Sequence, residues 1–582
     1  MTMRASAAGI LGLVLLSSTI ATGCRGAAEK KAQAQIDASL RGALQGSSRP
    51  PYVTADAEGT RLWKLTREFY ESRSFAPAWI EDAEPRAQMG DLIKALWSAD
   101  HEGLDPELYN VALLDQRKQE ASKGFLSKKG FEPADAGAFD VWLTYLYLKY
   151  SSDLADGISD LAHADPKWQI KPEKFDPREQ LEEALANNKI ADSLRDLAPD
   201  NAQYRTLRQA LTEYRALAAK GGWPQVPNVK LKPGQQSPAV AAIAKRLSIS
   251  GDYDGRVPAD GQTVAYDTKL VEAVKRFQRR HGLTDDGAIG AAVVAEMNVP
   301  VERRIAQIEL NLERWRWLPR ALGDRHILVN IPEYRLEVWE GDRVPVTMRT
   351  VVGKSDTPTP VFNDEMTHVV FSPYWNVPPN IAEGETLPAV LRDPDFLNRQ
   401  NMEVIDASGK PVEPGSIDLS DPGKYRFRQR PGASNSLGLV KFMFPNQFDV
   451  YLHDTPADSL FARASRSFSH GCVRLEQPQV LAEYVLREQP EWTKDRIEEA
   501  MRAGEEQHVK LKNPIPVYLG YWTARVSADG ILQFRKDIYG IDARQTGLLA
   551  DRLSRLRKSA AAASSAFLVP RPAGRSNGSS MP

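Results

Sequence analysis

Apolar residues recur three and four positions apart through much of residues 50–222. This spacing places them on one face of a helix, as in residues 91–97 and 139–147. Residues 181–197 and 204–217 carry the same pattern. We therefore predict a helical scaffold domain over 50–222, and we interpret its aromatic side chains as core residues rather than as a binding platform.

A smaller helical module is predicted over residues 228–300. Its clearest helix covers 270–281, where Leu270, Val274 and Phe277 share the inner face. Two further short helices and two turns rich in Gly and Asp complete the module. Three helices in about 70 residues leave little room for a catalytic centre, so chemistry is expected elsewhere.

The period of the apolar residues changes to two from about residue 301. Apolar and polar positions alternate over 327–331 and again over 334–338, which is typical of β-strands. We predict a β-rich domain over 301–550, with a long insertion at about 380–430 that is rich in Pro and Gly. Insertions of this length are usually functional, and we expect this one to cap a site. The whole chain is thus predicted to be a multidomain α+β protein.

The first residues have the layout of a secretory signal peptide over 1–24. An apolar run at 10–16 is too short to span a bilayer, and small residues follow it up to Cys24. Cys24 is a candidate for lipidation, which would anchor the chain to a membrane; the alternative is ordinary cleavage nearby.

Composition predicts little order at either end of the mature chain. Residues 25–49 are polar and are predicted to be a linker. Residues 551–582 are predicted to hold the end of a helix and a disordered tail, which begins at about 558.

Charge and cysteine content change this picture in two ways. Lys plus Arg (75) balance Asp plus Glu (76), so no global field favours nucleic acid, and no nucleic-acid partner is predicted.

The chain has two cysteines, Cys24 and Cys472. If an exported chain loses or lipidates Cys24, Cys472 is an unpaired thiol, which is typical of a reactive residue. A disulfide between the two would require the signal region to be retained.

Cys472 lies in the run Ser-His-Gly-Cys-Val-Arg at 469–474, and His453 lies nineteen residues before it. A thiol becomes a good nucleophile when a base takes its proton, so this pairing suggests acyl transfer. The amides of Gly471 and Cys472 are candidates to stabilise an oxyanion. A buried structural cysteine beside a satisfied histidine is the alternative.

Residues 448–453 are predicted to form a strand in which His453 points away from the core-facing side chains. The Asp454 side chain would then point to the opposite face. We therefore expect the backbone carbonyl of Asp454, rather than its carboxylate, to orient the imidazole. His453, His470 and Cys472 could supply three metal ligands, but no known zinc spacing is present, so neither a metal nor a cofactor is predicted.

The 469–474 run with His453 resembles the signature of L,D-transpeptidases with a YkuD-type catalytic domain. The resemblance extends to residues 374–379, 428–432, 441–446 and 451–456, which are similar to the YcbB-like branch. Residues 273–283, followed by Asp-Gly-Ala-Ile-Gly at 286–290, resemble a peptidoglycan-binding domain. Together these similarities cover about residues 50–550.

The resemblance implies that Cys472 attacks the carbonyl between the third and fourth residues of a peptidoglycan tetrapeptide stem. His453 would handle the proton, D-alanine would leave, and a meso-diaminopimelate amine would resolve the thioester as a 3→3 cross-link. It also implies that the partners are stem peptides and glycan in the periplasm of a Gram-negative bacterium.

Further residues receive roles near the substrate. Arg474 would favour a substrate carboxylate, or else is a solvent-facing charge at a strand end. His470 is expected to shape the substrate pocket. Substrate contact is also expected for Tyr451, and Tyr374 and Trp375 either line the acyl-donor groove or pack.

Three other functions stay open at this point. A hydrolase would give the same thioester to water, and a related transferase would give it to an amine of an outer-membrane protein. In a non-catalytic wall anchor Cys472 would be inert, which the presence of both Cys472 and His453 argues against.

Overall fold

The computed structural model describes residues 15–46, 49–122, 130–158, 165–393, 395–413, 424–527 and 529–567. The chain divides into two units, one formed by residues 1–161, 173–200 and 546–582 and the other by residues 162–172 and 201–545. Helical modules and a β-rich domain are both present, which confirms the predicted fold class. Within the described ranges, no helix combines the length and the apolar content that crossing a membrane requires.

The first unit is a helical domain built around helix α5, which is buried along most of its length. The buried Asp140 carboxylate accepts hydrogen bonds from the amides of Ala78, Trp79 and Ile80 and from the Tyr70 hydroxyl, so its polar atoms are satisfied. The helices and short strands are α1 (Leu15–Gln45), α2 (Ala57–Ser72), β1 (Ile80–Glu81), β2 (Glu84–Pro85), α3 (Ala87–Trp97), η1 (Ser98–Glu102), η2 (Pro106–Tyr109), α4 (Val111–Ser122), α5 (Pro133–Asp156), α7 (Pro177–Ala186), α8 (Ile190–Arg195) and α19 (Ile541–Phe567).

The predicted linker at 25–49 is instead largely helical, because it forms most of α1. Ile36, Leu40 and Leu44, spaced four residues apart, are buried. α1 lies so close to α5 that a Cβ on Gly137 would stand 2.3 Å from the Ile36 carbonyl oxygen. The prediction of a linker relied on the mostly polar composition of this segment and did not take its narrow apolar stripe into account.

Helix α19 continues to Phe567, beyond the predicted start of the tail at about 558. Leu556, Ala560 and Ala563 are buried, and the Phe567 ring stacks on Trp142 with centroids 4.5 Å apart. Alanine favours the helix here, and one apolar face docks on the domain. Residues 568–582 of the predicted tail and residues 1–14 of the predicted signal peptide lie outside the described residues, as does the side chain of Cys24.

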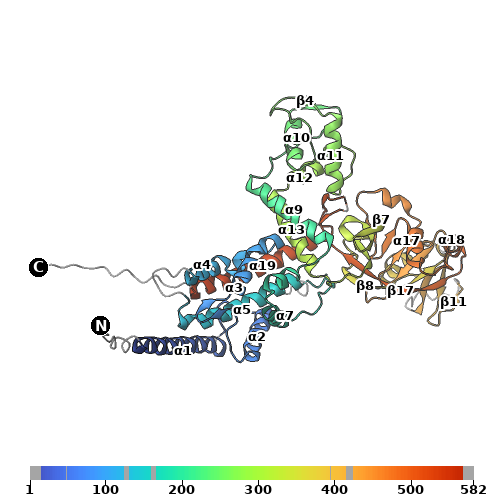
Figure 1. Cartoon of the computed structure of the whole chain (residues 1–582). Coiled ribbons are helices and arrows are strands. Elements are labelled where there is room, and N and C mark those ends of the chain that lie inside the picture. Colours follow the sequence, from blue (N-terminus) through green and yellow to red (C-terminus); the bar gives the residue numbers. More distant parts are fainter. Residues whose placement is uncertain are drawn as a thin grey trace, which may run out of the picture. The chain divides into compact units, whose positions relative to one another are not determined.

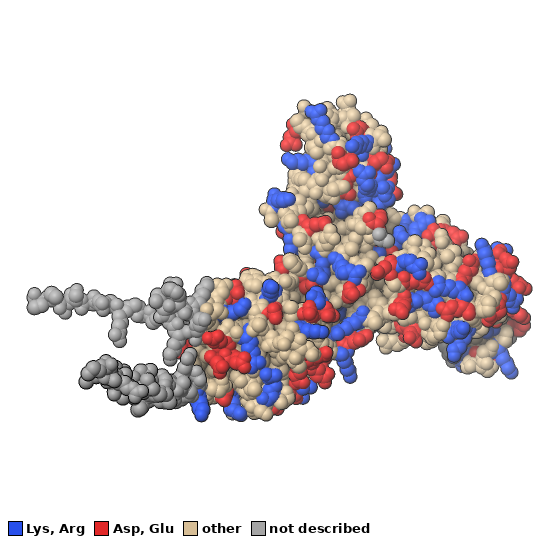
Figure 2. Space-filling model, in the orientation of Figure 1, with Lys and Arg blue, Asp and Glu red and all other residues tan. Residues whose placement is uncertain are grey.

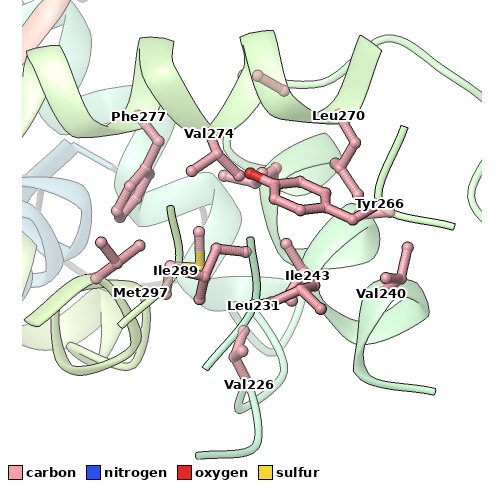
Figure 3. Close-up of a cluster of buried hydrophobic side chains, with 14 of the residues drawn as sticks. Val226, Leu231, Val240, Ile243, Tyr266, Leu270, Val274, Phe277, Ile289 and Met297 are labelled. Carbon is pink, nitrogen blue, oxygen red and sulfur yellow. The ribbon is translucent and has the colours of Figure 1, made fainter. Parts of the chain in front are cut away.

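The second unit contains the small helical module predicted at 228–300 (Figure 1). Its elements are β3 (Gln236–Ser237), α10 (Ala239–Ile249), β4 (Val264–Ala265), α11 (Thr268–Arg280) and α12 (Ala291–Met297). Side chains from all three helices, among them Ile243, Phe277 and Met297, meet in one core (Figure 3). Asp267 caps α11 by accepting a hydrogen bond from the Leu270 amide.

A nine-stranded sheet forms the β-rich domain, in the order β15-β7-β16-β14-β13-β8-β17-β5-β6. β6 also pairs with β7, so the strands from β7 round to β6 close into a ring. The strands are β5 (Arg325–Asn330), β6 (Arg335–Glu340), β7 (Arg343–Gly353), β8 (Phe362–Phe371), β13 (Val440–Met443), β14 (Leu452–His453), β15 (Ser467–Ser469), β16 (Val473–Leu475) and β17 (Gln507–Gly520). The elements outside the sheet are α9 (Ala202–Ala219), α13 (Val301–Arg316), η3 (Ile331–Glu333), η7 (Asp458–Ala462), α17 (Pro478–Leu486), α18 (Lys494–Arg502), β18 (Ala524–Val526) and β19 (Leu532–Phe534).

The insertion predicted at 380–430 has regular structure and a core of its own. Its sheet has the order β11-β10-β12-β9, and Leu397, Val404 and Phe427 pack inside it. Its elements are β9 (Trp375–Asn376), α14 (Pro379–Ile381), the π-helix η4 (Ala382–Thr386), α15 (Leu387–Arg392), α16 (Phe396–Arg399), β10 (Met402–Ile405), β11 (Pro411–Val412) and β12 (Arg426–Gln429). It is therefore a small subdomain rather than a loop.

We expect Phe277→Ala to destabilise the helical module by about 3–5 kcal/mol, because the ring is fully buried and its removal leaves a cavity. Hydrogen exchange should show faster exchange at the amides of α10, α11 and α12 and unchanged exchange in β8. Lys269→Ala, an exposed change on the same helix, should leave all of them unchanged. Equal acceleration in the module and in β8 would contradict an independent core.

Candidate active site

β14 lies between β13 and β16, and this order brings the candidate residues together. His453 is the register partner of Lys441 on one side and of Arg474 on the other. Register partners share a face of the sheet, so His453 stands between two cations. Cys472 directly precedes β16 and lies beside Tyr451, whose carbonyl accepts a hydrogen bond from the Val473 amide.

The predicted strand at 448–453 is shorter than expected, because β14 contains Leu452 and His453 alone. Asp449 has a positive φ of 52°, and Asn446 closes the preceding turn by donating to the Val450 carbonyl. His453 is 3% exposed, so the face of the strand on which the sequence placed it is covered rather than open to solvent. Alternation along a strand cannot separate two faces when neighbouring elements cover both.

The turn before the nucleophile is held by side chains. Gly471 has a φ of 124°, which disfavours residues with a Cβ, and its carbonyl accepts a hydrogen bond from Thr359 Oγ1 at 2.7 Å. Ser469 Oγ accepts from the Gly471 amide at 3.2 Å and donates to the Cys472 carbonyl at 2.5 Å. The Gly471 amide is therefore occupied within the turn, which leaves the Cys472 amide as the candidate oxyanion donor.

The Cys472 thiol is partly exposed, and its sulfur lies 3.8 Å from the Asp449 carbonyl oxygen. Burial raises the pKa of the Cys472 thiol, while hydrogen bonds from the amide and hydroxyl of Tyr451 and the charge of Arg474 act in the opposite direction. Burial also raises the pKa of Tyr451, with the neighbouring sulfur as the next cause. The resting thiol is therefore protonated near neutral pH.

His453 is held by a backbone carbonyl. Its Nδ1 lies 2.5 Å from the Asp454 carbonyl oxygen, and assigning the proton to Nδ1 leaves Nε2 able to accept one. Burial and then Arg474 lower the pKa of His453 to about 3, so the ring is neutral. The Asp454 carboxylate instead accepts from the amides of Leu439 and Thr455. The expected contact through the carbonyl is present in the structure.

The two cations beside His453 have few partners. Arg474 is largely buried, and its Nε has no hydrogen-bond partner among the described residues. Lys441 Nζ lies 4.0 Å from the nearest carboxylate oxygen, that of Glu506, and 6.0 Å from the centroid of the Tyr451 ring. Burial lowers the pKa of both side chains. Lys441 is not among the predicted site residues, since only the pairing of β13 with β14 brings it beside His453.

The remaining predicted residues connect the catalytic sheet to the insertion. His470 Nε2 lies 2.9 Å from the Glu385 carboxylate of η4. Tyr374 lies under the Arg428 guanidinium at 4.2 Å, and Trp375 packs against the insertion core. Glu385 carried no signal in the sequence, because its partner is 85 residues away.

Across the part of the chain that the structure describes, no group of three or more His, Cys, Asp and Glu side chains is arranged to hold a metal ion. The charged and titratable side chains that act on the pKa of the Cys472 thiol are Tyr451, Arg474 and Asp449. The arrangement suits nucleophilic attack by sulfur with proton transfer to a neutral imidazole.

Three segments match known protein families. Residues 64–211 match a family described as "Scaffold domain", residues 236–297 match "Putative peptidoglycan binding domain", and residues 324–500 match "L,D-transpeptidase catalytic domain". A relative from Haemophilus influenzae named "Putative L,D-transpeptidase" is 26% identical over 489 residues, which cover 83% of this chain and 79% of the relative.

Similarity to solved structures is weaker. An L,D-transpeptidase from Mycobacterium smegmatis is 16% identical, with a TM-score of 0.16, over 33% of this chain and 58% of that one. An L,D-transpeptidase from Stackebrandtia nassauensis is 14% identical, with a TM-score of 0.20, over 51% of this chain and 96% of that one. This chain thus spans little more than half of the Mycobacterium smegmatis structure.

The lowered pKa of His453 and the raised pKa of Cys472 predict how alkylation of Cys472 depends on pH. The imidazole stays neutral throughout the neutral range, and the thiolate fraction grows up to and beyond pH 9. We expect the iodoacetamide rate, read on the Cys472 peptide by mass spectrometry, to rise about tenfold per pH unit from 6 to 8 without an inflection near 6.5. A plateau below pH 7 would instead indicate a thiolate–imidazolium pair.

The His470–Glu385 contact predicts a small effect on the insertion. Glu385 is 59% exposed, and exposed pairs contribute about 0.2–1 kcal/mol, so Glu385→Gln should speed hydrogen exchange in η4 and α15 by less than about fivefold. Glu383→Gln, a neighbouring change at an exposed carboxylate, is the matched control. Equal effects of the two variants would argue against a specific contact.

Proposed function

The chain belongs to the L,D-transpeptidase family and is an enzyme of that class, and on this premise we propose that it forms 3→3 cross-links in peptidoglycan through a thioester on Cys472. The observation that carries the proposal is the parallel pairing of β14, which carries His453, with β16, which Cys472 directly precedes, together with the contact between Nδ1 of the imidazole and the Asp454 carbonyl. Together they supply a nucleophile, a base and a group that orients the base.

In the first half-reaction, Cys472 Sγ attacks the amide carbonyl between the third and fourth residues of a donor stem. The thiol proton passes to His453 Nε2, and the Cys472 amide stabilises the oxyanion. The C–N bond then breaks, and the imidazolium returns the proton to the leaving D-alanine. Because the resting imidazole is neutral, it can accept the proton without prior deprotonation.

In the second half-reaction, the side-chain amine of a neighbouring stem attacks the thioester carbonyl. The C–S bond breaks, the amine loses a proton through His453, and the thiol is restored. Water in place of the amine would give hydrolysis, and a protein amine would give attachment of that protein to the wall. The substrate class is supported by the matches over residues 236–297 and 324–500.

Arg474 and Lys441 are the residues that we assign to a carboxylate of the donor stem. A buried guanidinium nitrogen without a partner carries a desolvation cost that a bound carboxylate would offset. Lys441 adds a second positive charge on the other side of His453. His470, next to the turn, and Tyr451, beside the thiol, would complete the walls of the donor site.

A protein that acts on peptidoglycan works in the cell envelope. The signal-like segment 1–24 supports export to the periplasm, and Cys24 would provide a lipid anchor if it is modified. The mature protein would then act on the wall from the membrane surface.

The test incubates the purified protein with disaccharide-tetrapeptide muropeptides and, separately, with a carbapenem, and reads products and intact mass. We expect 3→3 dimers, free D-alanine and one covalent adduct in the native protein, and none of these in Cys472→Ala. Arg474→Gln should lower kcat/KM for muropeptides at least tenfold, since the loss of one charge-assisted bond costs about 1.5–3 kcal/mol.

The alternatives predict different products. Free tripeptide without dimers would identify a hydrolase. A mass that the carbapenem leaves unchanged, together with intact muropeptides, would refute the enzymatic mechanism on Cys472.

A further inference from the structure

A large hollow lies in the second unit, and neither Cys472 nor His453 lines it. It is a groove of about 2080 Å³, which we name the junction groove. Its lining comes from helices α9 and α11, from strands β6 and β7, from residues 462–467 and from the β18–β19 hairpin. Typical small-molecule pockets measure about 300–1,000 Å³, so the junction groove is large enough for a segment of a polymer.

The lining of the junction groove is polar and carries both charges. Acidic side chains such as Glu213 and Asp356 alternate with basic ones. Figure 2 likewise shows Lys and Arg interspersed with Asp and Glu over the visible face, without a large area of one sign. This mixture disfavours a polyphosphate chain, which selects surfaces of uniformly positive charge. It suits a neutral sugar chain that carries separate carboxylates.

Three exposed cations of the lining make no side-chain hydrogen bond and no ion pair among the described residues: Lys354, Arg463 and Lys536. Arg463 packs on the Phe468 ring at 5.1 Å, which holds its guanidinium in place. Most other basic residues of the groove have partners, as Arg280 does with Asp252. The three cations are therefore available to ligand carboxylates.

The wall of the junction groove is continuous with the catalytic turn. The Val352 amide donates to the Arg466 carbonyl, and the Lys354 amide donates to the Ser469 carbonyl, both at 2.9 Å. The segment that carries Arg463 thus pairs with β7 and then enters the turn at Gly471 and Cys472. A polymer bound in the groove would lie next to the segment that presents the nucleophile.

We propose that the junction groove binds a glycan strand of peptidoglycan, with Lys354 and Arg463 contacting carboxylates of its stem peptides. The inference rests on the proposed function, because it assumes that the substrate is peptidoglycan. The groove adds a polymer-binding site outside the donor site, so that the enzyme retains the wall while single stems react.

The test compares Lys354→Glu/Arg463→Glu with Lys510→Glu/Lys512→Glu, which changes the net charge equally at exposed positions outside the groove. Cosedimentation with purified insoluble peptidoglycan gives an apparent Kd, and turnover is measured on the polymer and on a soluble disaccharide tetrapeptide. The groove variant should bind the polymer at least fivefold more weakly and cross-link it correspondingly more slowly. Turnover of the soluble substrate should stay within twofold, as should both activities of the control variant.

Two outcomes would overturn the inference. Polymer binding as tight as that of the native protein would exclude the groove as a site. Equal losses on polymer and soluble substrate would indicate that the substitutions disturb the catalytic turn instead. If the native protein forms no product from either substrate, the proposed function fails, while the cosedimentation result still decides whether the groove binds the wall.

Discussion

The parallel pairing of β14 with β16 is the constraint on which the candidate active site depends. It joins two very short strands, yet it sets Tyr451 beside Cys472 and His453 beside Arg474. A slip of one residue would move His453 to the other face of the sheet. The flanking strands β13 and β7 and the closure of the ring by β6 prevent that slip. The precision of the site therefore comes from the whole barrel-like sheet.

Burial within this sheet determines the protonation of the site. The same desolvation that lowers the pKa of His453 raises the pKa of Cys472, so both groups rest in their neutral forms. Arg474 and Lys441 strengthen the effect on the imidazole. A substrate carboxylate near these cations would weaken their effect and favour the imidazolium. In the proposed mechanism, electrostatics would link substrate binding to activation of the nucleophile in this way.

The insertion and the three-helix module contact the β-rich domain at different places. The insertion has its own core and reaches the catalytic turn through Glu385 and His470. The three-helix module rests on the β18–β19 hairpin, where Arg535 donates to the Arg280 carbonyl and the Phe534 and His281 rings stack. Arg280 and Arg535 also line the junction groove. One β-rich domain can thus serve chemistry at one place and polymer binding at another.

The sequence by itself indicated the succession of helical and β-rich modules, and it singled out Cys472, His453 and the Asp454 carbonyl as the candidate nucleophile, base and orienting group. These features follow from local periodicity and from a short motif. Both can be recognised in the sequence without knowing how distant segments pack together. The burial of His453, the occupied Gly471 amide and the arrival of Lys441 and Glu385 were decided only by the tertiary structure. They depend on strand register and on contacts between residues far apart in the chain, which local patterns do not encode. The helical character of residues 25–45 and 558–567 was likewise decided by docking, because a narrow apolar stripe stabilises a helix only when a partner covers it.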